Sequence, residues 1–292
     1  MTLFQKIIKN LPLAIAGKEQ EFTSGSIRKA VFLLSVPMVL EMMMESIFFL
    51  VDAYFVSSLG PNAIATVGLT ESVLTLVYAI AIGLSMGATA IVARRIGEKN
   101  IQGASQTAVQ VIFLGVAVSI IVSIIGILFP KEILSLMGGE PDLVQEGYGY
   151  TQILLGGNVT VMLLFLINAI FRGAGDASTA MKVLIFSNIL NIILDPIFIF
   201  GLGPIPAFGV KGAAIATTIG RGSAVIFQIA ILFLGWTKIK LVLKDFVLRL
   251  GIMWNLIKVS LGGIGQFIIG TTSWVFLMRI MAEFGSELLA GY

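Results

Sequence analysis

The chain has 292 residues, of which 57% are hydrophobic and only 12% are charged, and its mean hydropathy is +1.01. Soluble domains carry roughly a quarter charged residues, so this composition excludes an ordinary soluble domain and predicts a protein that lies in the lipid bilayer. Cysteine and histidine are both absent, which excludes disulfide scaffolds, thiolate catalysis, zinc or haem sites built on these residues, and catalytic triads with a histidine base.

Seven apolar stretches are long enough to cross a bilayer, which takes about 20 mostly apolar residues in a helix. In chain order they cover residues 31–56, 69–92, 104–129, 149–171, 178–200, 212–235 and 255–281. The breaks between them contain charges or turn signals such as Gly60-Pro61-Asn62. The stretches lack the alternation of apolar and polar residues that barrel strands require. We therefore predict an all-α, polytopic membrane bundle.

Positive charges gather on one side of the predicted spans. Most of the 19 Lys and Arg residues lie in the N-terminal arm and in the second, fourth and sixth connections. Cytoplasmic connections carry an excess of Lys and Arg. We therefore expect a cytoplasmic N-terminus in the plasma (inner) membrane. The net charge of +3 is explained by this topology, and we expect no nucleic-acid partner.

The spans predict a six-helix lobe followed by the start of a second, repeated lobe. Shifted by 225 residues, the seventh span matches the first, with Ser35 on Ser260 and Gly60 on Gly285. Repeated halves are common in secondary transporters. Because the second copy stops at Tyr292, we expect a C-terminally truncated chain that lacks its C-lobe partner. The expected divisions are a cytoplasmic arm (1–30), an N-lobe of six transmembrane helices (31–236), an amphipathic cytoplasmic connector (237–254) and the seventh helix (255–292).

The first span carries three acidic residues, Glu41, Glu45 and Asp52, which lie within about 40° of one another on a helix. An ionisable group at the bilayer centre costs about 2.5–3.5 kcal/mol, so we expect this acidic stripe to have a specific role. It either provides a staged path for a cation or proton, or lines a wet vestibule and pairs with a basic group. Arg221 in the sixth span is a candidate partner for either glutamate.

The fifth span supplies a second polar face, because Asn188, Asn191 and Asp195 fall within an arc of about 60°. Amide and carboxylate oxygens suit Na⁺ or can hold a protonated carboxyl group. Hydrogen bonds between helices that only fix packing are the alternative. We predict a cation or proton site at Asp52, Asn168, Asn188, Asn191 and Asp195, with Na⁺ placed at Asp52, Asn191 and Asp195 and with Glu41, Glu45, Thr217 and Thr218 as accessory residues.

Pro37 lies inside the first span, where it removes the amide that would bond the carbonyl of Leu33. We expect a bend there, either as a fixed kink or as a hinge that responds to protonation of the acidic stripe and closes the adjoining cavity.

Small residues and methionines have structural interpretations of their own. The ladder of Gly212, Ala216, Gly220 and Ala224, like the pair Gly83 and Gly87, predicts close helix packing. Methionines of the first two spans, including Met38, Met42 and Met86, form either an adaptable cavity wall or plain packing.

Several short motifs follow one another in order along residues 28–290. They are Ser35-Val-Pro37, Asp52-Ala-Tyr-Phe-Val56, Gly60-Pro-Asn-Ala-Ile-Ala-Thr-Val-Gly68, Ala93-Arg-Arg-Ile-Gly97, Phe171-Arg-Gly-Ala-Gly-Asp176, Asn191-Ile-Ile-Leu-Asp-Pro196 and Gly209-Val-Lys-Gly-Ala-Ala-Ile-Ala-Thr217. Together they resemble the multidrug and toxic compound extrusion (MATE) family. The resemblance implies two six-helix lobes around a central cavity, and exchange of Na⁺ or H⁺ for amphipathic, often cationic, drugs.

The resemblance also implies site residues. In members with a cation site in the first lobe, the motif positions fall on Pro37 for the bend and on Asp52, Asn168, Asn191 and Asp195 for the site. A further threonine of that site falls on a small residue, which leaves Thr217 or Thr218 as substitutes. No Asp or Glu lies between Lys258 and Met281, where members with a second-lobe site carry an acidic residue, so coupling through the first lobe is favoured.

These features predict an antiporter coupled to H⁺ or Na⁺ that exports small amphipathic organic cations by alternating access, without a cofactor. A flippase for a lipid-linked precursor and a non-transporting truncated membrane protein are the alternatives. A flippase should have a basic cavity, which the acidic stripe argues against. An enzyme is not expected, because no pair of nucleophile and base stands out.

Overall fold

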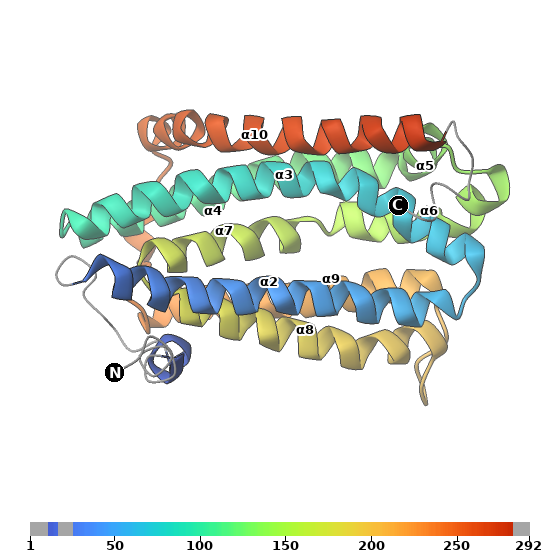
Figure 1. Cartoon of the computed structure of the whole chain (residues 1–292), viewed down its shortest axis with the longest axis horizontal. Helices are drawn as coiled ribbons and strands as arrows, with labels where there is room; N and C mark the ends of the chain where they lie inside the picture. The colour runs from blue at the N-terminus through green and yellow to red at the C-terminus, as the bar shows by residue number, and fades with distance from the viewer. Residues whose placement is uncertain (1–10, 17–25, 283–292) are drawn as a thin grey trace.

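The computed structural model describes residues 11–16 and 26–282, with side chains described as far as residue 273. In these ranges the chain is a bundle of long helices (Figure 1). They are α2 Ile27–Ser57, α3 Pro61–Gly97, α4 Ile101–Leu128, α5 Pro130–Leu136, α6 Pro141–Gly156, α7 Val159–Gly173, α8 Ala177–Phe200, α9 Val210–Leu234, the 3₁₀ turn η1 Leu243–Asp245 and α10 Leu250–Ala282. Seven helical stretches in this part of the chain are long and apolar enough to cross a membrane. The predicted all-α membrane bundle is therefore confirmed.

The long helices run between two ends of the bundle (Figure 1). We call the end that holds Arg94, Arg95 and Arg172 the arginine-rich end. Because each span crosses the bundle once, α2, α4, α8 and α10 start at this end and α3, α7 and α9 finish there.

The fourth span differs from its prediction in its start and in its continuity. It covers Pro141–Gly173 rather than 149–171, and it consists of α6 and α7 with a short break between them. Asp142 and Glu146 make the first part of α6 polar, so apolar length alone placed the start too late.

The break between α6 and α7 is held by Asn158, a buried residue. Its Nδ2 donates to the Leu155 carbonyl of α6 at 2.5 Å and to Ser123 Oγ of α4 at 2.9 Å. The Ser123 hydroxyl donates in turn to the Gly156 carbonyl at 2.8 Å. Backbone groups freed inside a membrane need such partners. The amide side chain thus makes the interruption tolerable and ties it to α4.

Polar side chains cap the starts of two other helices, α4 and α8. Asn100 accepts a hydrogen bond from the Gly103 N–H at the start of α4, and Asp176 accepts one from the Thr179 N–H at the start of α8. Such caps satisfy amides that have no partner within the helix. Proline occupies the first turn of α3, α5 and α6, where its missing N–H costs nothing.

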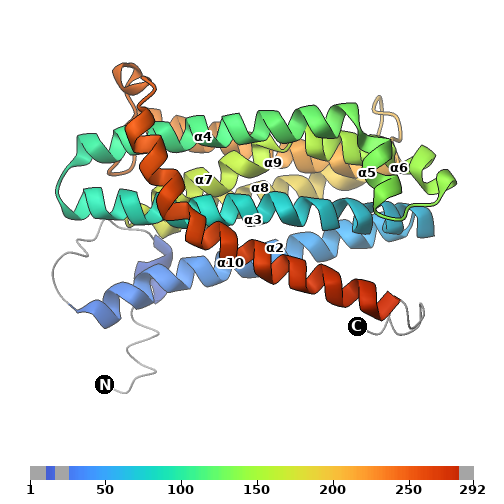
Figure 2. The same cartoon turned by 90° about the horizontal axis from the view of Figure 1, so that it is seen from above.

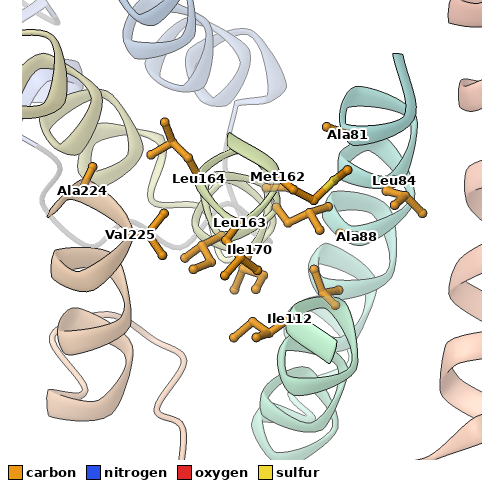
Figure 3. Close-up of a cluster of buried hydrophobic side chains, with 14 of the residues drawn as sticks. Ala81, Leu84, Ala88, Ile112, Met162, Leu163, Leu164, Ile170, Ala224 and Val225 are labelled. Atoms are coloured by element: carbon orange, nitrogen blue, oxygen red, sulfur yellow. The ribbon is translucent and has the colours of Figure 1, made fainter. Parts of the chain in front are cut away.

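The core surrounds α7, whose side chains are buried along most of its length. In Figure 3, the side chains of α7, among them Met162, lie between α3, which carries Leu84, and α9, which carries Val225. Lipid tails are as apolar as these side chains, so close packing rather than expulsion of water stabilises the cluster.

Small residues bring α8 and α9 together, as the ladder predicts. A Cβ on Gly212 would overlap the Phe198 carbonyl, and one on Gly220 would lie 3.2 Å from Asn191 Cβ. The close approach at Gly220 places Asn191 of α8 directly against α9.

The connection before α10 is fastened by Gln110 of α4. Its Nε2 donates to the Val247 carbonyl and its Oε1 accepts from the Arg249 N–H, both at 2.9 Å. The helix then starts at Leu250, inside the segment 237–254 that we expected as a connector. From there α10 crosses α3 obliquely (Figure 2). The repeat match at Gly285 lies outside the described residues.

Residues 11–16 form a short helical segment against the start of α8. The Ser178 hydroxyl donates to the Ile15 carbonyl at 2.5 Å, and Lys182 Nζ donates to the Ala16 carbonyl at 3.0 Å. The rest of the arm predicted at residues 1–30, apart from 26–30 at the start of α2, lies outside the described residues.

The crossing of α3 and α10 depends on Gly83 and Gly87. A Cβ on Gly83 would overlap Ile264, and one on Gly87 would overlap Ser260. We expect Gly87→Leu to destabilise the protein by about 1–3 kcal/mol through overpacking. Thermal unfolding in detergent measures this. Gly68→Leu, in the same helix with open space around it, is the control, and equal effects of the two changes would contradict the assignment.

Candidate functional site

A cavity of about 700 Å³ lies between α2, α3, α7 and α8, in the half of the bundle nearer the arginine-rich end. Most of its lining is apolar, and it includes the methionines Met38, Met42 and Met86. Methionine is flexible and adapts to ligands of different shape. The polar lining residues are Glu41, Glu45, Ser85, Thr89, Asn168 and Arg172.

Glu41 of α2 is held by two residues of α7. Arg172 Nη1 lies 2.9 Å from Glu41 Oε1 and 3.3 Å from Oε2, and Asn168 Nδ2 donates to Oε1 at 3.0 Å. Asn168 is fixed in turn, because Gln228 Nε2 of α9 donates to its side-chain oxygen at 2.7 Å. The side chains of Glu41 and Arg172 are only 12% and 17% exposed. This shielded ion pair ties α2 to α7.

Glu45, one turn further along α2, lies beside a second arginine. Arg221 Nη2 of α9 is 3.5 Å from Glu45 Oε2, and the Arg221 side chain is 4% exposed. The guanidinium carbon lies 4.9 Å from the centre of the Phe48 ring and 5.9 Å from that of Tyr78. Aromatic faces stabilise a buried cation in this way.

The acidic stripe of the first span is therefore divided between two environments. Glu41 and Glu45 line the cavity and each has an arginine partner, whereas Asp52 is buried away from it. Of the two glutamates considered for Arg221, the structure pairs it with Glu45. Arg172, which the sequence analysis assigned to a connection, lies in the last turn of α7.

Asp52, Asn191, Asp195 and Thr217 form a second polar site, which we call the carboxylate pocket. Asn191 Nδ2 donates to Asp195 Oδ1 at 3.2 Å and to Thr217 Oγ1 of α9 at 3.3 Å. Asp52 comes from α2, which packs on α8. It is 8% exposed and Asp195 is fully buried, and their carboxyl groups interact electrostatically.

Three oxygens of the carboxylate pocket accept no hydrogen bond from the described residues: Asp52 Oδ1, Asn191 Oδ1 and Asp195 Oδ2. Buried oxygens usually have a partner, and carboxylate and amide oxygens are ligands for hard cations. Within the described ranges, no group of three or more His, Cys, Asp or Glu could hold a metal. The donor set fits Na⁺, or a proton carried by a carboxyl group.

Besides Glu41 and Glu45, three predicted site residues lie outside the carboxylate pocket. Asn168 belongs to the Glu41 contact. Asn188 Nδ2 donates to the Met44 carbonyl at 3.0 Å, which matches the alternative that it fixes helix packing. Thr218 Oγ1 donates to the Ala214 carbonyl of its own helix at 2.8 Å.

Two polar residues near these sites, Glu71 of α3 and Gln228 of α9, were not predicted from the sequence. Glu71 interacts electrostatically with Arg221 and Asp52. The predicted span began at residue 69, which made Glu71 look like a boundary residue, but α3 begins at Pro61. A charged side chain well inside a span was the signal that could have identified it.

Pro37 is buried inside α2, which continues as one helix on both sides of it. The Ser35 hydroxyl donates to the Val31 carbonyl at 2.7 Å, within the two turns that precede the proline. A hinge at Pro37 stays a prediction.

Known proteins resemble this chain over much of its length. The MatE family profile matches residues 37–197, more than half of the chain. A protein of Thermotoga maritima named probable multidrug resistance protein NorM is 32% identical over 195 residues, which covers 67% of this chain and 42% of the relative. An FAD transporter of Shewanella oneidensis is 30% identical over 194 residues, which covers 66% of this chain and 43% of the relative.

The fold is similar as well. A solved structure described as the outward-facing conformation of a multidrug resistance MATE family transporter of the MOP superfamily gives a TM-score of 0.82 at 32% identity. That match covers 92% of this chain and 59% of the other. The chain thus spans less than two thirds of the relatives it matches. Together with the profile match, these similarities show that the chain belongs to the MatE family, the multidrug and toxic compound extrusion transporters.

Proposed function

We propose that the protein is a cation-coupled antiporter that exports small amphipathic organic compounds by alternating access, with H⁺ or Na⁺ as the coupling ion. The observation that carries this proposal is the presence of two different sites on α2. Asp52 contributes to a buried pocket with three free oxygens, and Glu41 and Glu45 line a largely apolar cavity. A single helix therefore belongs to both an ion site and a substrate site.

The coupling ion is proposed to bind at Asp52, Asn191 and Asp195. Two buried carboxylates that interact electrostatically are costly to keep charged, because they repel each other and have lost their hydration. A bound Na⁺ or proton removes this cost and strengthens the contact between α2 and α8. Pro37, where α2 lacks one backbone hydrogen bond, is the proposed point at which the helix bends in response.

The proposed substrate is a small amphipathic organic cation. A cavity of about 700 Å³ is in the size range of drug-binding sites. Its methionines adapt to varied apolar shapes, and Glu45, with only one long contact to Arg221, is the carboxylate that meets the positive charge. The name of the Thermotoga relative, a probable multidrug resistance protein, agrees with this substrate class.

A second candidate substrate is an organic anion. Both cavity glutamates have an arginine partner, so the lining is not acidic overall, and Arg172 itself lies in the cavity wall. The Shewanella relative is named an FAD transporter, and FAD carries phosphate groups that arginine binds well.

We further propose that the protein lies in the plasma membrane with its N-terminus in the cytoplasm. The gathering of arginines at one end of the bundle supports this orientation, because cytoplasmic connections are rich in Lys and Arg. In that orientation the cavity lies toward the cytoplasm and the carboxylate pocket toward the outside. Because its relatives are longer, we propose that a second lobe completes the cavity.

The test is efflux from proteoliposomes that contain the complete gene product. Vesicles are loaded with ethidium, a fluorescent organic cation, and a Na⁺ gradient or a pH gradient is imposed. The proposal predicts that one of the gradients accelerates ethidium efflux. Vesicles loaded with FAD test the second candidate. If neither gradient moves either compound, the antiporter proposal is wrong and the non-transporting alternative is favoured.

A further inference from the structure

Arg221 is a buried cation that the exchange of ion and substrate described above does not use. It lies in the middle of α9 with 4% of its side chain exposed, and its Nη1 has no acceptor among the described residues. A guanidinium stays charged in proteins, and a charge in the bilayer core requires compensation. The position of its counter-charges therefore matters for function.

Three carboxylates attract this guanidinium, but only Glu45 contacts it. Glu45 of the cavity wall is nearest, at 3.5 Å, and Asp52 of the carboxylate pocket and Glu71 of α3 also interact electrostatically with it. Glu45 and Asp52 are seven residues apart on α2, or about 10 Å along the helix axis. Arg221 thus interacts electrostatically with a carboxylate of the cavity, Glu45, and with one of the carboxylate pocket, Asp52.

The contact between Arg221 and Glu45 is longer, and has fewer hydrogen bonds, than the contact between Arg172 and Glu41. Glu41 receives three hydrogen bonds of 2.9–3.3 Å from Arg172 and Asn168, whereas Glu45 receives one of 3.5 Å. A firm pair resists a competing cation, but a single long contact can be shared with other carboxylates.

We propose that Arg221 links the two sites as a shared counter-cation, so that a cation at Asp52 and an organic cation at Glu45 exclude each other. When Asp52 is neutralised by its ion, the guanidinium is drawn to Glu45 and cancels its charge. When Asp52 is bare, it shares the guanidinium and leaves Glu45 free to attract a substrate. The inference rests on the proposed function and adds a residue that couples the two binding events.

The test uses Asp52→Asn, which removes the charge of Asp52 whichever ion is coupled and leaves Asp195 unchanged. The affinity of the purified complete gene product for tetraphenylphosphonium is measured at fixed pH and Na⁺ concentration, for the natural protein and for Asp52→Asn, Arg221→Gln and the double variant. Coupling between sites is typically worth about 5–150-fold in affinity. We expect Asp52→Asn to weaken binding at least about fivefold when Arg221 is present, and to have a much smaller effect in the Arg221→Gln background.

Two further variants keep the result decisive if Arg221→Gln folds poorly. Glu45→Gln removes the carboxylate that receives the guanidinium, so Asp52→Asn should then have little additional effect. Glu41→Gln is the matched control, because Glu41 lines the same cavity but pairs with Arg172, and the effect of Asp52→Asn should persist there.

The outcomes separate the two proposals. If Asp52→Asn weakens binding equally with and without Arg221 or Glu45, the shared counter-cation is wrong while the antiporter proposal stands. If the natural protein does not bind tetraphenylphosphonium at all, the proposed cationic substrate is wrong, and the link fails with it.

Discussion

Asp195→Asn is expected to lower ion-driven export at least about tenfold, the size of loss typical when ligands around a bound cation are altered. The change keeps the shape of the side chain and its neighbour Asn191, but it replaces one of two carboxylates in the carboxylate pocket by an amide. An amide neither carries a proton in this exchange nor offers a full charge to Na⁺. The initial rate of ethidium efflux under the effective gradient, in proteoliposomes, measures the loss.

Two adjacent threonines supply a matched control for this result. Thr217 Oγ1 accepts a hydrogen bond from Asn191 in the carboxylate pocket, whereas Thr218 bonds only to the backbone of its own helix. Thr217→Val should therefore lower ion-driven efflux, and Thr218→Val should leave it nearly unchanged. Undiminished efflux in Asp195→Asn would remove the carboxylate pocket from the transport cycle.

Arg172→Gln is expected to destabilise the protein by about 3 kcal/mol, because loss of one partner leaves a shielded charge on Glu41 without compensation. Glu41 keeps its hydrogen bond from Asn168, but it loses the cation that offsets its burial. The measurement is the shift in unfolding temperature of the purified protein in detergent. Glu41→Gln in the same background should restore part of the stability, since it removes the unpaired charge.

The exposed pair of Arg94 and Glu98 provides the comparison. Its nitrogen–oxygen distance of 2.8 Å is as short as that of the shielded pair, but its side chains are 79% and 39% exposed. Water and salt screen such a pair, so Arg94→Gln should leave the unfolding temperature almost unchanged. Equal shifts for Arg94→Gln and Arg172→Gln would show that burial does not decide the strength of these contacts.

The membrane fold could be predicted from the sequence because its signals are long and local. Apolar length gives the number and order of the spans, and the turn residues separate them. Apolar length does not define where a span starts if its first turns are polar, as in α6, or if it is interrupted, as at Asn158. There the boundary depends on partners from α4 that lie far away in the sequence.

The candidate site was predictable in part for a similar reason. Helical spacing correctly grouped Asn191 with Asp195, because they lie one turn apart in one helix. It could not decide which polar residues of different helices meet. Asn168, which we predicted to lie with Asp195, donates its hydrogen bond to Glu41 instead. Glu71 was overlooked because the predicted start of its span was misplaced.

The most direct measurement of the central claim is the release of the coupling ion when substrate binds. Purified complete gene product is equilibrated with radioactive ²²Na⁺ or placed in weakly buffered solution, and tetraphenylphosphonium is added. If the carboxylate pocket exchanges its ion for substrate in the cavity, the natural protein releases Na⁺ or protons, and Asp52→Asn and Asp195→Asn release neither. Equal release from these variants and the natural protein would contradict the account.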